Sequence, residues 1–194
     1  MATSIYSDAK HRNVFIVIVP LFVDSGFDQD FGILENALRS VGGILKPGDL
    51  VVLETIVSPG TTDVLARAWL EESSGLKVGD FHLAYSPERI MTGYSISRLR
   101  EFPKVIGGVD NDSGFVAYGV YKKFISNLSM VSTAKTAELI KVMEGCYRDV
   151  NIALANELFK IAEEIGSSST RRGPTTTTNS VISTTNSVIL FCPP

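Results

Sequence analysis

Histidine and cysteine are scarce in this sequence of 194 residues, which has two of each. Cys146 and Cys192 form no Cys-x-x-Cys pair, so neither a disulfide framework nor a cysteine zinc site is indicated. His11 and His82 lie far apart in the sequence and give little support to a metal site or a Ser-His-Asp triad. We therefore expect no bound metal ion.

The sequence also lacks a large excess of charge of one sign and lacks long apolar runs. The formal net charge is −3, so nothing global attracts the chain to nucleic acid or to an anionic membrane. No stretch reaches the roughly 18 apolar residues that a membrane helix requires. The first apolar run is short and follows polar and charged residues, unlike a secretory signal. The composition predicts a cytoplasmic protein with neither nucleic acid nor membrane among its partners.

Short β-branched apolar runs alternate with helical patterns along the first two thirds of the chain. Continuous apolar runs are typical of strands that are buried on both faces of a parallel sheet. We expect strands at 14–19, 50–53, 81–85, 104–106 and 130–131. Helices are expected at 31–41, after Thr61 or Thr62 with Val64, Leu65, Ala68 and Trp69 buried, and at 115–124. This order predicts an α/β fold with a mostly parallel sheet.

A long helical pattern runs from about Ala134 to Gly166 without a proline. Apolar residues recur along it at steps of three and four, namely Ile140, Met143, Tyr147, Val150, Leu154, Leu158 and Ile161. The simplest interpretation of this stripe is core. At 1.5 Å per residue the helix would span about 50 Å. A helix of that length bridges two domains or packs against a second subunit.

The last segment, 167–194, has a different character. Thr177–Ile182 recurs as Thr184–Ile189, and the segment has too little apolar content to fold alone. We expect an unstructured low-complexity tail, although its threonine and valine content would also suit β-type association. A change of reading frame in the coding sequence is one explanation for the segment.

Ligands of parallel α/β sheets lie beyond the carboxyl ends of the strands. Three segments follow predicted strands there: 20–24, 54–62 and 85–90. Gly60-Thr61-Thr62 opens a helix and could bind an anion, or the threonines could serve only as caps. Glu88 follows a proline at a strand end, where a carboxylate could meet a ligand or form a surface ion pair.

Seven short motifs, in one order, resemble the UDP-glucose/GDP-mannose dehydrogenase superfamily. They are Val17–Pro20, Leu45–Glu54, Pro59–Thr62, Tyr85–Arg89, Lys104–Gly108, Ala134–Leu139 and Asn151–Leu158. The resemblance runs from about Val14 to Gly166. The Pro-Glu-Arg form is most similar to UDP-N-acetylmannosamine or UDP-N-acetylglucosamine 6-dehydrogenases. The resemblance implies an NAD-dependent oxidation of the C6 alcohol of a UDP-sugar to a carboxylate.

The resemblance also implies roles for particular residues. Lys141 matches the family lysine that acts in proton transfer and stabilises charge on the reacting oxygen, and Glu88 matches the glutamate that assists water attack. Arg89, Ile90 and Arg148 match substrate contacts, as does Lys141. Pro20 and Thr55 fall at the cofactor in this comparison. In relatives the long helix packs against its twin, so a homodimer is implied.

Several family features are missing or altered. No Gly-x-Gly-x-x-Gly turn occurs, and neither cysteine lies in the glycine-rich loop that carries the family's nucleophile. Leu21 and Ile56 replace two threonines that touch the cofactor, and Gly145 replaces an asparagine at the reacting centre. We therefore expect an internal, inactive piece that binds NAD poorly.

The same resemblance divides the chain into three parts: the second half of a Rossmann-like domain at 1–132, a connecting or dimerisation helix at 133–166, and a tail at 167–194. Two alternatives remain open. One is a non-catalytic module that dimerises or pairs with a full-length relative. The other is a piece of a 6-phosphogluconate or 3-hydroxy acid dehydrogenase, against which the Pro-Gly-Thr-Thr and Ser-Pro-Glu-Arg motifs count.

Overall fold

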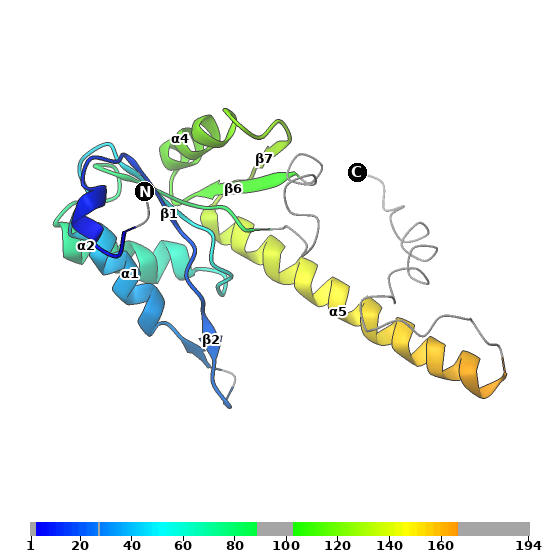
Figure 1. Cartoon of the computed structure of the whole chain (residues 1–194). Coiled ribbons are helices and arrows are strands. Elements are labelled where there is room, and N and C mark those ends of the chain that lie inside the picture. The colour runs from blue at the N-terminus through cyan, green and yellow to red at the C-terminus, as the bar shows by residue number, and fades with distance from the viewer. Residues whose placement is uncertain (1–2, 27, 89–102, 167–194) are drawn as a thin grey trace. The chain divides into compact units, whose positions relative to one another are not determined.

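A five-stranded sheet organises the first of the two units into which the computed structural model divides the chain, Met1–Val142 and Met143–Pro194. The structure describes residues 3–26, 28–88 and 103–166. The strands are β1 (Val14–Val17), β4 (Leu50–Leu53), β5 (His82–Tyr85), β6 (Lys104–Gly108) and β7 (Leu128–Met130), and they lie in this order. Figure 1 labels β1, β6 and β7. All neighbours pair in parallel except β5 and β6, which are antiparallel. The expectation of a mostly parallel α/β sheet is confirmed.

Helices cover both faces of this sheet. On one face, α1 (Gly32–Gly42), α2 (Arg67–Ser74) and the start of α5 (Ala134–Glu164) bury a large cluster against β1, β4 and β5. On the other face, α4 (Asn111–Tyr121) covers β4, β5 and β6 through Ala117 and Tyr121. Because β4 is buried on both faces, all four of its residues are apolar.

The predicted strands and helices lie close to the observed ones, with differences at their ends. Helix α4 begins four residues before the predicted start because Asp110 accepts a hydrogen bond from the Ser113 backbone N–H and so caps the helix. Strand β7 begins at Leu128 rather than Met130.

The predicted buried face of the helix that follows Thr61 is wrong in part: Leu65 and Trp69 are partly buried, but the other two residues are not. Val64 and Ala68 are exposed, whereas Ala66 and Leu70 are completely buried. The helix begins with a π-helical segment, η2 (Thr62–Ala66). A π turn holds more residues than an α turn, so the residues that follow it are rotated relative to a regular α pattern. Trp69 is partly buried and packs against Phe31, with ring centroids 6.1 Å apart.

Two small elements had no clear sequence signal. A 3₁₀ helix, η1 (Tyr6–Ala9), precedes β1. After β1, the strands β2 (Phe22–Val23) and β3 (Gln29–Asp30) form a separate antiparallel pair. Asp24 lies between β2 and β3, and its carboxylate accepts hydrogen bonds from the backbone N–H groups of Gly26 and Asp28.

In the second unit, the structure describes the later part of α5 and the residues up to Gly166. The predicted stripe continues along this part of the helix as an exposed face. Its members Met143, Tyr147, Val150, Leu154, Leu158 and Ile161 are each 53% exposed or more. In the single chain, the interpretation of the stripe as core therefore applies only to Ile140, which packs against the main cluster, and is wrong for the later members. Within the described residues, no helix has the length and apolar content to cross a membrane.

Candidate active site

The loops that follow β1, β4 and β5 meet at one edge of the sheet because these three strands are parallel and adjacent. Thr55 joins the first two loops. Its hydroxyl accepts a hydrogen bond from the Val19 backbone N–H at 3.1 Å and donates one to the Val19 carbonyl at 2.8 Å. The hydroxyl is therefore engaged with the backbone, and it fixes the chain just before Pro20.

The loop before η2 binds a carboxylate of the protein itself. The Glu138 carboxylate, on α5, accepts hydrogen bonds from the backbone N–H groups of Gly60 and Thr62. It also accepts the Thr62 hydroxyl at 2.6 Å. Gly60 adopts a φ of +99°, a conformation that side chains rarely allow, to present its N–H group in this turn. The predicted anion site is thus occupied internally, and the Thr61 hydroxyl binds the Ser58 carbonyl instead of capping the helix.

Glu138 is completely buried in this contact. Burial raises the pKa of its carboxyl group because the charged form loses water, while the donors of Thr62 and Gly60 act in the opposite direction. The contact attaches α5 to the loop after β4. Since Lys141 lies three residues further along α5, Glu138 fixes the helix turn that carries Lys141.

Lys141 contacts the backbone of Glu88. The Lys141 ammonium group donates a hydrogen bond to the backbone carbonyl of Glu88. Lys141 is partly buried on α5, and Glu88 is partly buried in the loop after β5. The contact therefore joins the central helix to the loop at the carboxyl end of the sheet.

A buried ion pair lies beneath the same loop. Lys104, the first residue of β6, binds the Glu54 carboxylate at 2.7 Å, and the two side chains are 13% and 9% exposed. Tyr121, the last residue of α4, donates its hydroxyl hydrogen to the same carboxylate. The pKa of Tyr121 is raised by burial and by the negative charge of Glu54, so the hydroxyl stays protonated and remains a donor.

Sequence reasoning missed Glu54, Lys104, Tyr121 and Glu138 as members of the site. A signal for two of them was present, because Glu54 directly follows the apolar run of β4 and Lys104 directly precedes that of β6. A charged residue next to a buried strand needs a partner. The partners themselves come from distant parts of the chain, which no local pattern can identify.

Tyr85 is a further buried polar group near the site. Its ring belongs to the main core cluster, and its hydroxyl is buried. Burial and the nearby Glu138 and Glu54 raise the pKa of Tyr85, so it is neutral at physiological pH.

The other predicted site residues are dispersed or not described. Arg148 is exposed on α5 and lies 3.7 Å from the Asp149 carboxylate. Pro20 and Ile56 are exposed, and Leu21 is partly buried. Arg89 and Ile90 lie outside the described residues, as does Cys192; Cys146 is an exposed free cysteine on α5. Among the described residues, no group of three or more potential ligand side chains could hold a metal ion.

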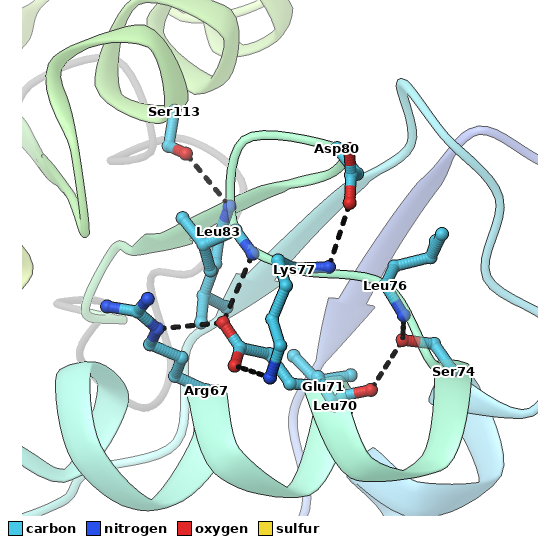
Figure 2. Close-up of polar contacts among 10 residues, drawn as sticks. Arg67, Leu70, Glu71, Ser74, Leu76, Lys77, Asp80, Leu83 and Ser113 are labelled. Atoms are coloured by element: carbon cyan, nitrogen blue, oxygen red, sulfur yellow. Dashed lines mark hydrogen bonds and ion pairs between the residues drawn. The ribbon is translucent and has the colours of Figure 1, made fainter.

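A separate polar cluster stabilises the far end of α2 (Figure 2). The Glu71 carboxylate accepts hydrogen bonds from Arg67, from the Lys77 ammonium group and from the Val78 backbone N–H. These contacts lower the pKa of Glu71 to about 2, with the Lys77 hydrogen bond as the largest cause. The cluster fixes the turn between α2 and β5.

The sheet, its covering helices and the long helix define the class of Rossmann-type dehydrogenases. A solved structure of UDP-D-ManNAc dehydrogenase from Pyrococcus horikoshii is similar to the chain with a TM-score of 0.81 and 36% identity. The alignment covers 95% of this chain and 42% of that one.

The family follows from the sequence. Models of the UDP-glucose/GDP-mannose dehydrogenase family match residues 1–125, as the NAD binding domain, and residues 135–186, as the central domain. The chain belongs to this family, whose cofactor is NAD. The matches extend beyond the interval 14–166 that carries the motifs, and the second continues into the threonine-rich segment.

Curated relatives agree with this family. UDP-N-acetyl-D-mannosamine dehydrogenase from Pyrococcus horikoshii is 42% identical over 162 residues, which are 82% of this chain and 38% of the relative. The enzyme of the same name from Methanocaldococcus jannaschii is 40% identical over 160 residues, 81% of this chain and 36% of the relative. The chain thus spans well under half the length of the relatives it matches.

Proposed function

We propose that this chain supplies part of the active site of an NAD-dependent UDP-sugar 6-dehydrogenase. The enzyme would oxidise the C6 alcohol of a UDP-N-acetylhexosamine to the uronate, as the names of the relatives suggest. The observation that carries the proposal is the contact between Lys141 on α5 and the Glu88 carbonyl. It brings together the two residues that match the family's catalytic lysine and glutamate.

In this proposal Lys141 acts on the reacting oxygen. The neutral amine of Lys141 would accept the proton of the C6 hydroxyl. The ammonium group so formed would stabilise negative charge on the C6 oxygen, which a partly buried cation does more strongly than an exposed one. The Glu88 carboxylate would orient and activate the water that hydrolyses a covalent intermediate. The cysteine that forms this intermediate in the family has no counterpart in a glycine-rich loop of these 194 residues.

Substrate contacts would come from Arg89, Ile90, Lys141 and Arg148. Arg148 lies seven residues after Lys141, two turns along α5, so the two cations share a side of the helix. A lysine and an arginine on one side suit a diphosphate or a sugar acid.

The residues near Pro20 and Thr55 fit NAD poorly. The Thr55 hydroxyl is already engaged with Val19, and Ile56 presents an apolar side chain that is 54% exposed. The helix N-terminus that could receive a pyrophosphate is occupied by Glu138. We infer an affinity weaker than millimolar for NAD⁺, about 4 kcal/mol or less of binding free energy, for this chain alone.

The domain boundaries are part of the proposal. Residues 1–132 would be the later part of the dinucleotide-binding domain, 133–166 the connecting helix, and 167–194 a low-complexity tail.

The 194-residue chain should not turn over by itself. It contains neither a Gly-x-Gly-x-x-Gly turn nor a cysteine in a glycine-rich loop. We expect no NADH formation from NAD⁺ with UDP-N-acetylmannosamine or UDP-N-acetylglucosamine, measured by absorbance. The Pyrococcus horikoshii relative serves as the positive control. Steady NADH production by the purified chain would overturn this part of the proposal.

A second candidate function is a non-catalytic dimerisation module. The exposed apolar face of α5, which includes Leu154 and Leu158 at 55% and 53% exposure, favours it. Such a module would pair with a second copy or with a full-length relative through this helix. Because both matching family models describe nucleotide-sugar dehydrogenases, they favour these two functions over the 6-phosphogluconate or 3-hydroxy acid alternative.

A further inference from the structure

The loop Ser86–Glu88 is held by two lysines that come from different elements. The Lys104 ammonium group lies 3.2 Å from the Ser86 carbonyl oxygen and 3.4 Å from that of Pro87. Lys141 binds the carbonyl of the next residue, Glu88. Three consecutive carbonyl groups therefore bind the two ammonium groups.

The antiparallel direction of β6 makes this arrangement possible. Because β6 runs opposite to β5 and Gly107 pairs with Tyr85, the last residue of β5, the start of β6 continues past the end of β5 alongside the loop. The Ser86 hydroxyl donates to the Val105 carbonyl at 2.7 Å and joins the loop to β6 a second time. Ser86 and Pro87 are both buried in this contact.

All the hydrogen-bonding capacity of Lys104 is used. An ammonium group has three donors, and the partners of Lys104 are the Glu54 carboxylate and the carbonyls of Ser86 and Pro87. Its charge also lies 5.1 Å from the centre of the Tyr121 ring, a cation–π distance. Glu54 and Tyr121 thus restrict Lys104 to one position.

Stability alone does not account for this buried pair. The cost of removing two charges from water is similar to the attraction between them, so a buried ion pair contributes little net stability compared with apolar side chains. What the pair does provide is a fixed geometry for two carbonyl groups of the loop.

We propose that Lys104, oriented by Glu54 and Tyr121, is a positioning residue that holds the Ser86–Glu88 loop against Lys141. The inference rests on the proposed function only in treating Glu88 and Lys141 as catalytic. Lys104 contacts the loop backbone and acts on the reaction through the position of Glu88.

The test uses the full chain and two local probes. The first is the hydrogen-exchange rate of the Ser86 amide, which bonds to the Leu53 carbonyl, compared with the β4 amides of Val51 and Val52. The second is the NMR signal of the Lys141 Cε in lysine-labelled protein. In Lys104→Met, we expect Ser86 exchange to increase about 10-fold while the β4 amides change less than about twofold. The Lys141 signal should move as its carbonyl partner shifts.

Matched variants separate positioning from general stability. Lys123→Met removes an exposed lysine just after α4 and should change neither probe. If Lys104→Met does not fold, the double variant Glu54→Gln with Lys104→Met removes both charges of the pair. The Ser86 exchange rate and the Lys141 signal are then measured in this double variant, with the same expected results. If amide exchange increased equally at Ser86 and in β4, or if the Lys141 signal did not move, the ion pair would be a structural contact only and the proposal would be wrong. Neither probe requires NAD or turnover, so the outcome is independent of whether the proposed activity is correct.

Discussion

Glu71 on α2 accepts hydrogen bonds from three donors while its side chain is only 12% exposed. The folded state lowers its pKa from 4.5 to about 2. A carboxyl group with a depressed pKa binds fewer protons in the folded state than in the unfolded state over this range. Its contribution to stability is therefore present above pH 4.5 and is lost as the pH falls toward 2.

We predict that Glu71→Gln lowers the free energy of unfolding by about 1 kcal/mol at pH 7. The difference from the unmodified chain should shrink as the pH falls below 4.5, where the native glutamate is itself protonated in the unfolded state. Urea unfolding at a series of pH values measures this difference. Glu163→Gln, an exposed glutamate on α5, is the control and should have little effect. A difference that stays constant down to pH 3 would contradict the assigned ion pairs.

Single residues also mark the limit of prediction from the sequence. The resemblance indicated Lys141 and Glu88, and the structure brings their segments into contact. It did not indicate Glu138, whose partner Thr62 lies 76 positions away in the sequence. Threonines at the start of a helix predict a side-chain cap for its backbone N–H groups. Here the Glu138 carboxylate accepts those hydrogen bonds, and its position depends on the packing of α5.

For helices and strands, hydrophobic runs predicted where the strands lie but not the direction of every strand or the buried face of every helix. The bounds of β4 follow directly from its four apolar residues. The antiparallel direction of β6 could not be predicted, because an apolar run has the same pattern in either direction. The phase of α2 was missed because the π-helical segment η2 interrupts the regular 3.6-residue period.

Two glycines give a prediction for the contact between the sheet and the helices. A Cβ atom at Gly107 in β6 would lie 2.1 Å from the Thr133 carbonyl oxygen, a backbone atom just before α5. At Gly119, exposed in α4, it would meet nothing within 4 Å. We expect Gly107→Ala to cost about 3 kcal/mol, at the upper end for overpacking.

The matched variant Gly119→Ala should instead stabilise the chain by about 0.5–1 kcal/mol, since alanine is the better helix former. Thermal or urea unfolding of the two variants measures both changes in the free energy of unfolding, which should have opposite signs. A Gly107→Ala chain as stable as the unmodified one would mean that the backbone at Thr133, just before α5, does not lie against Gly107.

At the scale of the whole molecule, the later part of α5 presents an apolar face to solvent. Water contact with such a face is unfavourable by about 25 cal/mol per Å². A self-complementary pairing of two copies would cover it. We predict that the folded chain is a dimer or larger, and that Leu154→Asp with Leu158→Asp shifts it toward monomer or causes aggregation.

Light scattering after size exclusion measures the assembly. A control of equal charge change is Asn156→Asp with Lys160→Gln, because 100° per residue places both positions away from the stripe. This control should remain assembled. A stable monomer of the unmodified chain at high micromolar concentration would show that the exposed face does not mediate self-association.

We propose above that Lys141 and Glu88 act together in the active site of a UDP-sugar dehydrogenase. A chimera tests it most directly: the 162-residue aligned segment of this chain replaces its counterpart in the Pyrococcus horikoshii relative. The family residues are restored by Leu21→Thr, Ile56→Thr and Gly145→Asn. The rest of the relative would then supply the glycine-rich turn and the cysteine loop that the family resemblance implies.

The measurement is kcat for NADH formation from UDP-N-acetylmannosamine by this chimera, with and without Lys141→Met. We predict measurable turnover and a loss of at least about 100-fold on removing the lysine, the scale of general acid–base catalysis. Lys135→Met, an exposed lysine on the same helix, should leave kcat within a few-fold. A folded chimera without turnover, or one whose kcat is unchanged by Lys141→Met, would contradict a catalytic role for Lys141.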